Sequence, residues 1–177
     1  GTYYARDNNG NLLKTTQGLL QPERGVQTTA LQGTTDRGAD GQPKTTGVGS
    51  TELRKVIVGQ DAHTYRYEGG GAAVLGSIQP QPLANLPDGT LDLAMVEAAI
   101  KPDDSHFAVT RLLALENTIG GKVIARDYLA RAVTLAWKRG LSTHLDGARI
   151  FNAAVALAMP VNTLCAGFDT VSVCLSK

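Results

Sequence analysis

The sequence is short of aromatic residues, of net charge and of long apolar runs, and each shortage excludes a class of partner. Aromatic residues make up 5% of the 177 residues, too few for a platform that stacks the bases of single-stranded nucleic acid. The formal net charge of +1 predicts no general attraction to nucleic acid or to anionic membranes. No run reaches the roughly 18 apolar residues of a membrane-spanning helix. We therefore expect neither nucleic acid nor membrane as a partner.

Cysteine is also scarce. The two cysteines, Cys165 and Cys174, are too few for a disulfide framework. Both lie in apolar surroundings and are interpreted as buried thiols, which is typical of a reducing cytoplasm. No basic and then apolar leader opens the chain. These features predict a cytoplasmic location.

The first 54 residues differ in composition from the rest. Gly and Thr supply 18 of the first 50 residues, and no sustained period of 2.0 or 3.6 residues appears. Such a segment buries too little apolar surface to offset the ordering of its backbone, so residues 1–54 are predicted to be irregular or disordered. Residues 55–177 are predicted to form one α/β domain. Because the chain begins at Gly1 and ends on Lys177, we also expect it to be a fragment of a longer protein.

The last third of the chain predicts a strand, a helix and a second strand. Residues 141–146 are a short, mostly apolar run that ends at Asp146, and residues 169–177 are a similar run that ends at Lys177. Residues 150–158, between them, are rich in Ala and are predicted to be helical. This order is typical of a parallel βαβ unit, in which both strands deliver their carboxyl ends to the ligand-binding edge of the sheet.

An acid and an amine at one edge suit the chemistry of pyridoxal phosphate (PLP). A lysine amine condenses with a carbonyl to form a Schiff base. A carboxylate that faces a pyridine nitrogen keeps that nitrogen protonated. Alternatively, Asp146 belongs to a turn before Gly147 and Lys177 is an unrelated charge, because strand ends commonly carry charge. Spacing alone leaves both interpretations open.

Five motifs, in this order, carry a resemblance to a known family. They are Val58–Tyr65 (VGQDAHTY), Ala73–Ser77 (AVLGS), Leu115–Thr118 (LENT), His144–Ala153 (HLDGARIFNA) and Val173–Lys177 (VCLSK). Together they resemble the low-specificity L-threonine aldolases, PLP enzymes with the aspartate aminotransferase fold. The resemblance covers about residues 56–177. It implies a three-layer α/β sandwich with a mostly parallel sheet, here an incomplete large domain of PLP fold type I.

The resemblance implies a role for each of five residues. Lys177 would hold the cofactor covalently, and Asp146 would face its pyridine nitrogen. His63 would lie against the cofactor ring and take part in proton transfer. Glu116 would line the site, and Arg149 would lie beside the ring oxygen or the substrate carboxylate. Without the resemblance, His63 and Arg149 would be interpreted as helix-surface side chains and Glu116 as part of a strand-end turn. No metal ligand is assigned.

Three further positions bear on the site. Ile119 and Gly120 stand where many relatives have a histidine and an asparagine, so a polar contact from that position to a substrate hydroxyl is not expected. Residues 47–51 imitate a phosphate-binding turn, but only four residues separate them from the strand at Val56, too few for the expected helix. They are therefore interpreted as loop. His144 would face the same side of the sheet as Asp146, either as a hydrogen-bond donor to it or as core.

The remaining elements are predicted from periodicity and from breakers. Strands are expected at 56–58, 72–78 and 109–115, and helices at 61–68, 91–100 and 127–139. Asp61 is expected to cap the first of these helices, and Trp137 is expected to pack against the core. Pro80 and Pro82 are expected in a loop.

Two functional hypotheses follow. The resemblance implies a PLP-dependent carbon–carbon lyase that cleaves L-threonine or L-allo-threonine to glycine and acetaldehyde, with a role in threonine catabolism and glycine biosynthesis. Its ligand would be a small β-hydroxy-α-amino acid, and the parent protein would be a homodimer or homotetramer. A β-eliminating lyase or an aminotransferase of the same fold is the nearest neighbour. Alternatively, the isolated chain is a non-catalytic fragment that at most binds a ligand weakly or oligomerises.

Overall fold

A computed structural model describes residues 4–6, 12–13, 54–104 and 106–176. Two stretches considered for the site lie outside the described residues: the candidate lysine Lys177, and residues 47–51, which were interpreted as loop. Within the first 54 residues the structure describes two short strands and Arg54. The proposed boundary between an irregular segment and an α/β domain stays a prediction.

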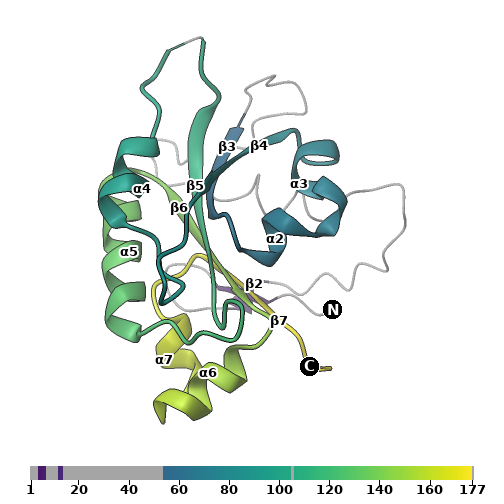
Figure 1. Cartoon of the computed structure of the whole chain (residues 1–177), viewed down its shortest axis with the longest axis vertical. Helices are drawn as coiled ribbons and strands as arrows, with labels where there is room; N and C mark the ends of the chain where they lie inside the picture. Colours follow the sequence, from purple (N-terminus) through teal and green to yellow (C-terminus); the bar gives the residue numbers. More distant parts are fainter. Residues whose placement is uncertain (1–3, 7–11, 14–53, 105, 177) are drawn as a thin grey trace.

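The described residues form a mostly parallel sheet, as predicted (Figure 1). Its strand order is β2-β1-β7-β6-β5-β3-β4. Neighbouring strands from β7 to β4 are parallel, whereas β1 pairs antiparallel with both β7 and β2. The strands are β1 (Tyr4–Arg6), β2 (Leu12–Leu13), β3 (Arg54–Gly59), β4 (Ile78–Leu83), β5 (Val109–Glu116), β6 (Ser142–Gly147) and β7 (Thr170–Val173).

Helices cover both faces of the sheet and complete three layers. Figure 1 shows α4 and α5 along one face, with α2 and α3 on the opposite side. The helices are α2 (His63–Arg66), the 3-10 turn η1 (Glu68–Gly70), α3 (Gly71–Val74), α4 (Leu93–Ala99), α5 (Arg126–Lys138), α6 (Ile150–Leu157) and α7 (Val161–Cys165). The predicted βαβ unit is present, with α6 and α7 between parallel strands β6 and β7.

The core lies between the sheet and its helices. Ile57, Leu113 and Leu145 occupy the middle strands β3, β5 and β6 and are at most 1% exposed. Strands in the interior of a parallel sheet are covered on both faces, which explains why these segments read as apolar runs. From α5, residues such as Ala132 and Ala136 are fully buried, and their small side chains let the helix lie close to the sheet. This packing holds the carboxyl ends of the strands in place.

The predicted strand at residues 72–78 is wrong. Gly71–Val74 form helix α3, and the strand begins only at Ile78. It continues through Pro80 and Pro82, so the loop expected at these two prolines is also wrong. A short apolar run does not distinguish strand from helix, so the residues after the glycines were open to either conformation. Prolines are tolerated here because β4 is the edge strand of the described sheet, where it pairs with β3 alone, so no further described strand needs their missing N–H groups.

Two predicted side-chain roles are also wrong. Ala62, not Asp61, occupies the N-cap of α2, and no side chain caps that helix. The Asp61 carboxylate instead lies 3.5 Å from the Arg66 guanidinium. Trp137 is 60% exposed, on the solvent side of α5, because the buried stripe of that helix runs through residues such as Tyr128, Leu129 and Ala132.

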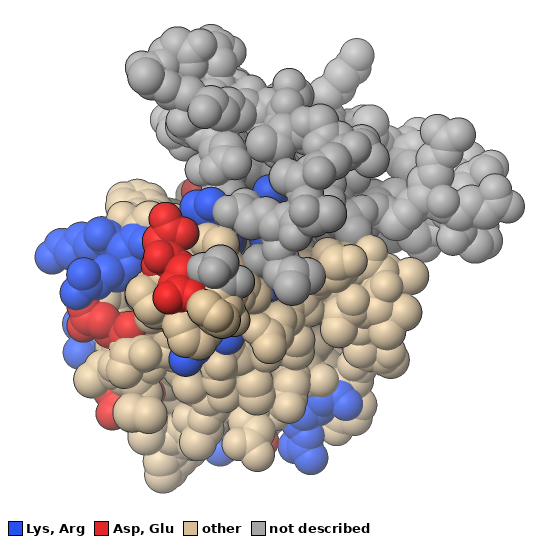
Figure 2. Space-filling view, turned by 90° about the horizontal axis from the view of Figure 1, so that it is seen from above, with Lys and Arg blue, Asp and Glu red and all other residues tan. Residues whose placement is uncertain are grey.

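Charge is mixed on the surface. On the face seen in Figure 2, side chains of both signs lie near one another, and uncharged residues fill most of the described surface. This distribution agrees with the formal net charge of +1. Among the described residues, no helix has the length and apolar character needed to cross a membrane.

Candidate functional site

Two carboxylates meet at the carboxyl edge of the sheet. Glu116 ends β5 and Asp146 lies near the end of β6, and the two residues are register partners on these neighbouring parallel strands. The backbone N–H of Asn117 donates to the carbonyl of Asp146 at 3.0 Å and extends the pairing by one residue. The edge predicted for ligand binding therefore presents two acidic side chains together.

A cleft of about 910 Å³ lies at this edge, between α2, the loop that follows β5 and the first turns of α6. Three of the predicted site residues, His63, Glu116 and Arg149, line it. Asp146 does not line it but lies beside Glu116, one strand away. The structure thus brings together every predicted site residue that it describes, and the roles of these residues stay predictions.

His63 is held at the wall of the cleft by three contacts. It is the first residue of α2, and its backbone N–H donates to Glu116 Oε2 at 2.7 Å. Its ring nitrogen Nδ1 lies 2.9 Å from Glu68 Oε1. Its ring also lies against that of Tyr67, with 4.8 Å between the centroids. The backbone of this histidine is therefore held by Glu116, and its ring by Glu68 and Tyr67.

Glu116 is a buried acid, with 9% of its surface exposed. Burial raises the pKa of its carboxyl group above the ordinary value of 4.5, because the charged form loses its hydration. The hydrogen bond from the backbone of His63 opposes this shift, and the nearby Asp146 carboxylate adds to it. Glu116 therefore holds its proton to a higher pH than an exposed glutamate does.

The raised pKa of Glu116 makes stability depend on pH. Folded Glu116 binds its proton more tightly than unfolded Glu116, so its contribution to stability is complete below pH 4.5 and is lost as pH rises through the folded-state pKa. Glu116→Gln should remove this decline. Urea unfolding of both proteins between about pH 4 and pH 7 checks it, and equal pH slopes for the two proteins would contradict it.

Asp146 is oriented by its neighbours. Its Oδ1 atom accepts hydrogen bonds from the Ala148 N–H at 3.0 Å and from the Ser172 hydroxyl at 3.3 Å. Within the described part of the chain both bonds go to Oδ1, which leaves Oδ2 for another donor. Gly147 permits this arrangement, because a Cβ atom there would lie 2.8 Å from the backbone oxygen of Ser172. The close approach of β6 and β7 therefore requires glycine at this position.

His144 was expected either to donate a hydrogen bond to Asp146 or to pack in the core, and the hydrogen bond to Asp146 is not formed. Its Nδ1 lies 2.8 Å from the Thr170 hydroxyl. Burial lowers the pKa of His144, and the nearby Asp146 carboxylate opposes that shift. Ser172 instead donates to Asp146, a role that the sequence analysis missed. This contact of Ser172 becomes visible only in the structure, where β6 and β7 pair Asp146 with Ser172.

Three cationic side chains line the cleft: Arg66, Lys122 and Arg149. Arg149 is exposed at the N-cap of α6, directly after the turn that carries Asp146. Lys122 follows Gly120 and Gly121 in the loop after β5. Sequence reasoning had selected only Arg149, although Lys122 stands just beyond the LENT motif. These cations outnumber the two acidic residues that line the described part of the cleft, Asp61 and Glu116, so the cleft suits an anionic ligand.

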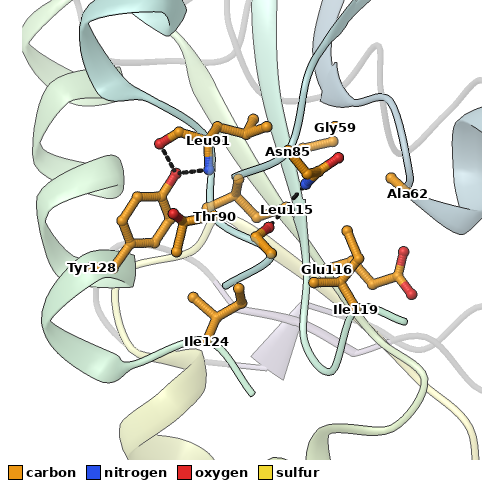
Figure 3. Close-up of a pocket in the computed structure, with 12 residues that line it drawn as sticks. Gly59, Ala62, Asn85, Thr90, Leu91, Leu115, Glu116, Ile119, Ile124 and Tyr128 are labelled. Atoms are coloured by element: carbon orange, nitrogen blue, oxygen red, sulfur yellow. Dashed lines mark hydrogen bonds between the residues drawn. The ribbon is translucent and has the colours of Figure 1, made fainter. Parts of the chain in front are cut away.

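A second, much smaller pocket lies beside the cleft and is almost filled by side chains. It has a volume of about 10 Å³, room for no more than a water molecule. Figure 3 shows the residues that line it, with the Glu116 carboxylate at its margin. The Tyr128 hydroxyl donates to the Leu91 carbonyl and accepts from the Leu91 N–H, both at 2.9 Å. Burial raises the pKa of Tyr128 to about 12. Its hydroxyl is therefore a structural link between α5 and the chain before α4, and the larger cleft is the candidate ligand site.

Comparison with known proteins places these features in a family. Residues 47–177 match the family described as beta-eliminating lyase. A low specificity L-threonine aldolase from Escherichia coli is 56% identical over 121 residues, 68% of this chain and 36% of that protein. A probable low-specificity L-threonine aldolase 2 from Arabidopsis thaliana is 44% identical over 128 residues, 70% of this chain and 36% of that protein.

Solved structures show the same fold. A threonine aldolase from Leishmania major superposes with a TM-score of 0.60 at 24% identity, over 69% of this chain and 36% of that one. A putative aromatic amino acid beta-eliminating lyase/threonine aldolase from Exiguobacterium superposes with a TM-score of 0.57 at 26% identity, over 72% and 34%. The chain spans about a third of the length of the curated relatives that it matches.

Proposed function

The chain belongs to the beta-eliminating lyase family, and from this membership we propose that it is the cofactor-binding part of a lyase that cleaves L-threonine or L-allo-threonine to glycine and acetaldehyde. The observation that carries the proposal is the pair of acids at the carboxyl edge of the sheet. Asp146 is oriented by two donors there, beside Glu116 and a cleft lined by His63 and Arg149.

The family depends on PLP, which when bound supplies an electron sink for the pair released as the Cα–Cβ bond breaks. The donor set at the edge fits this group. Asp146 has one carboxylate oxygen left for a protonated pyridine nitrogen. His63 presents an aromatic ring at the cleft, and Arg66, Lys122 and Arg149 complement a phosphate or a carboxylate.

We assign each site residue one role in binding or in proton transfer. Lys177, which lies outside the described residues, would hold the cofactor through its amine. Asp146 would accept a hydrogen bond from the protonated pyridine nitrogen and so favour the protonated form. His63 accepts the proton of the substrate's β-hydroxyl, and Arg149 binds the substrate carboxylate. Glu116 positions His63 by accepting a hydrogen bond from the backbone N–H of His63.

Other properties of the whole protein follow from the resemblance and belong to this proposal. We expect a homodimer or homotetramer that acts in the cytoplasm, in threonine catabolism and glycine biosynthesis. A second candidate function concerns the isolated chain, which would bind a ligand or oligomerise without cleaving threonine. The observation that favours it is that the chain covers only 36% of its relatives.

A cofactor-binding experiment tests the proposal. Purified chain mixed with PLP should develop an absorption band near ~420 nm, and borohydride should then fix the cofactor on Lys177, as located by mass spectrometry. The control is Lys177→Ala, which should show neither band nor adduct. The same samples are assayed for glycine and acetaldehyde released from threonine. A band without cleavage supports the cofactor-binding part alone, whereas neither band nor cleavage contradicts the proposal and leaves the second candidate.

A further inference from the structure

Two glutamates hold His63 from different elements. Glu116, at the end of β5, accepts the backbone N–H of His63. Glu68, in the turn after α2, lies 2.9 Å from the ring nitrogen Nδ1. The first contact sets where the residue stands and the second sets how its ring is turned. His63 also lines the cleft, so the state of its other ring nitrogen, Nε2, matters for whatever binds there.

The contact with Glu68 determines which ring nitrogen carries the proton. The Glu68 side chain is 56% exposed, and an ionised carboxylate only accepts hydrogen bonds. The atom that faces it, Nδ1, must therefore be the donor. A neutral imidazole carries a single N–H, so Nε2 is then left with its lone pair. In the described part of the chain no protein group bonds to Nε2, which leaves that lone pair for a ligand.

The backbone around Glu68 supports a specific role. Glu68 has a φ of 59°, in the left-handed region that side chains other than Gly and Asn rarely adopt, and Gly69 and Gly70 follow with φ of 59° and 70°. This run of left-handed residues joins α2 to α3, and from it the Glu68 carboxylate reaches His63. Strained non-glycine residues cluster at functional sites, and Glu68 touches a residue that lines the cleft.

We propose that Glu68 is a positioning residue that fixes neutral His63 as its Nδ1–H tautomer, so that Nε2 is the atom that accepts a proton in the cleft. The inference rests on the proposed function, because the proton comes from the β-hydroxyl of the substrate. The O–H bond breaks and an Nε2–H bond forms. The electron pair of the O–H bond makes the aldehyde carbonyl as Cα–Cβ breaks. The pair of that broken bond is left on Cα, where a proton converts it into a C–H bond of glycine.

Nuclear magnetic resonance of the chain itself tests this, without cofactor or substrate. The chain has three histidines, so long-range ¹H–¹⁵N spectra of histidine-labelled protein are readily assigned. At about pH 8.5, two units above the ordinary histidine pKa, His63 should show a protonated Nδ1 and an unprotonated Nε2. Glu68→Ala should lose this signature and turn to the Nε2–H form. Glu68→Gln, whose amide both donates and accepts, should give a mixture.

The chain offers a matched control. His106 Nδ1 lies 2.7 Å from Asp104 Oδ1 in a separate exposed pair, so Asp104→Asn should alter His106 and leave His63 unchanged. Unchanged His144 signals, which depend on β6 and β7, show that each variant is folded.

An Nε2–H tautomer in the unmodified chain, or an unaltered tautomer in Glu68→Ala, would overturn the proposal. If the Ala variant does not fold, an unaltered tautomer in Glu68→Gln decides against it. Either result leaves the cofactor-binding experiment untouched, and a chain that binds no PLP leaves the tautomer assignment standing.

Discussion

Asp146→Asn in the full-length protein should lower kcat/KM for threonine cleavage by about 10³-fold, the size of effect seen when a preorganised electrostatic contact to developing charge is removed. An amide at this position no longer stabilises a protonated pyridine nitrogen, so the electron sink weakens although the cofactor still binds. The two donors to Oδ1, Ala148 and Ser172, remain able to hold an amide oxygen, so the variant should keep its fold. Steady-state kinetics and the absorption spectrum of bound cofactor measure the two effects separately.

Ser172→Ala is the matched control for Asp146. It removes one hydrogen bond to the carboxylate and leaves the charge in place. A hydrogen bond to a charged group contributes roughly 1.5 kcal/mol, so activity should fall by about tenfold rather than a thousandfold. Full activity in Asp146→Asn would remove the carboxylate from the proposed mechanism.

Asn117→Leu should lower the free energy of unfolding by about 2–5 kcal/mol. Asn117 is fully buried, and both polar atoms of its side chain form hydrogen bonds to the backbone of Ile124. Its Nδ2 donates to the Ile124 carbonyl and its Oδ1 accepts the Ile124 N–H, each at 3.1 Å. Leucine has a similar volume but leaves both backbone groups of buried Ile124 without these partners. These two bonds close the loop over residues 118–123, which lines the cleft.

Urea unfolding measures the effect of Asn117→Leu. Asn152→Ala serves as its control, because Asn152 lines the same cleft from the exposed side of α6, and its loss should change stability by less than about 0.5 kcal/mol. If Asn117→Leu were as stable as the control, the two bonds to Ile124 would not hold the loop. A loss of ligand binding without a loss of stability would instead mean that these bonds shape the loop for its ligand but contribute little to stability.

The local pattern of the sequence was enough for several elements. Helix α5 was predicted at residues 127–139 and is observed at Arg126–Lys138, because its apolar stripe, its basic last turn and Gly140 all act within one segment. Strand β5 was predicted for the same kind of reason. The error at residues 72–78 arose where local pattern is ambiguous: a short apolar run after three glycines suits either conformation, and the position of β4 at the sheet edge permits its prolines.

Some residues of the candidate site were found from the sequence, and others are visible only in the structure. His63, Glu116, Asp146 and Arg149 were selected from motifs and meet at one edge, although their roles stay predictions. Ser172 and Lys122 were missed because neither is exceptional in its own segment. Ser172 touches Asp146 only because β7 pairs with β6 in one register.

By itself the sequence determined the alternation of strands and helices, the near-neutral charge and the residues able to carry the chemistry, since these properties depend on composition and on neighbours along the chain. Only the tertiary structure decided which of these residues touch: Glu116 beside Asp146, Ser172 on Asp146 and Glu68 on His63. The physical reason is that register between strands and the path of a turn are set by packing between whole elements. A shift of one residue in strand register would exchange the partners of Glu116, Asp146 and Ser172, whereas the contact of Glu68 with His63 depends on the path of the turn between α2 and α3.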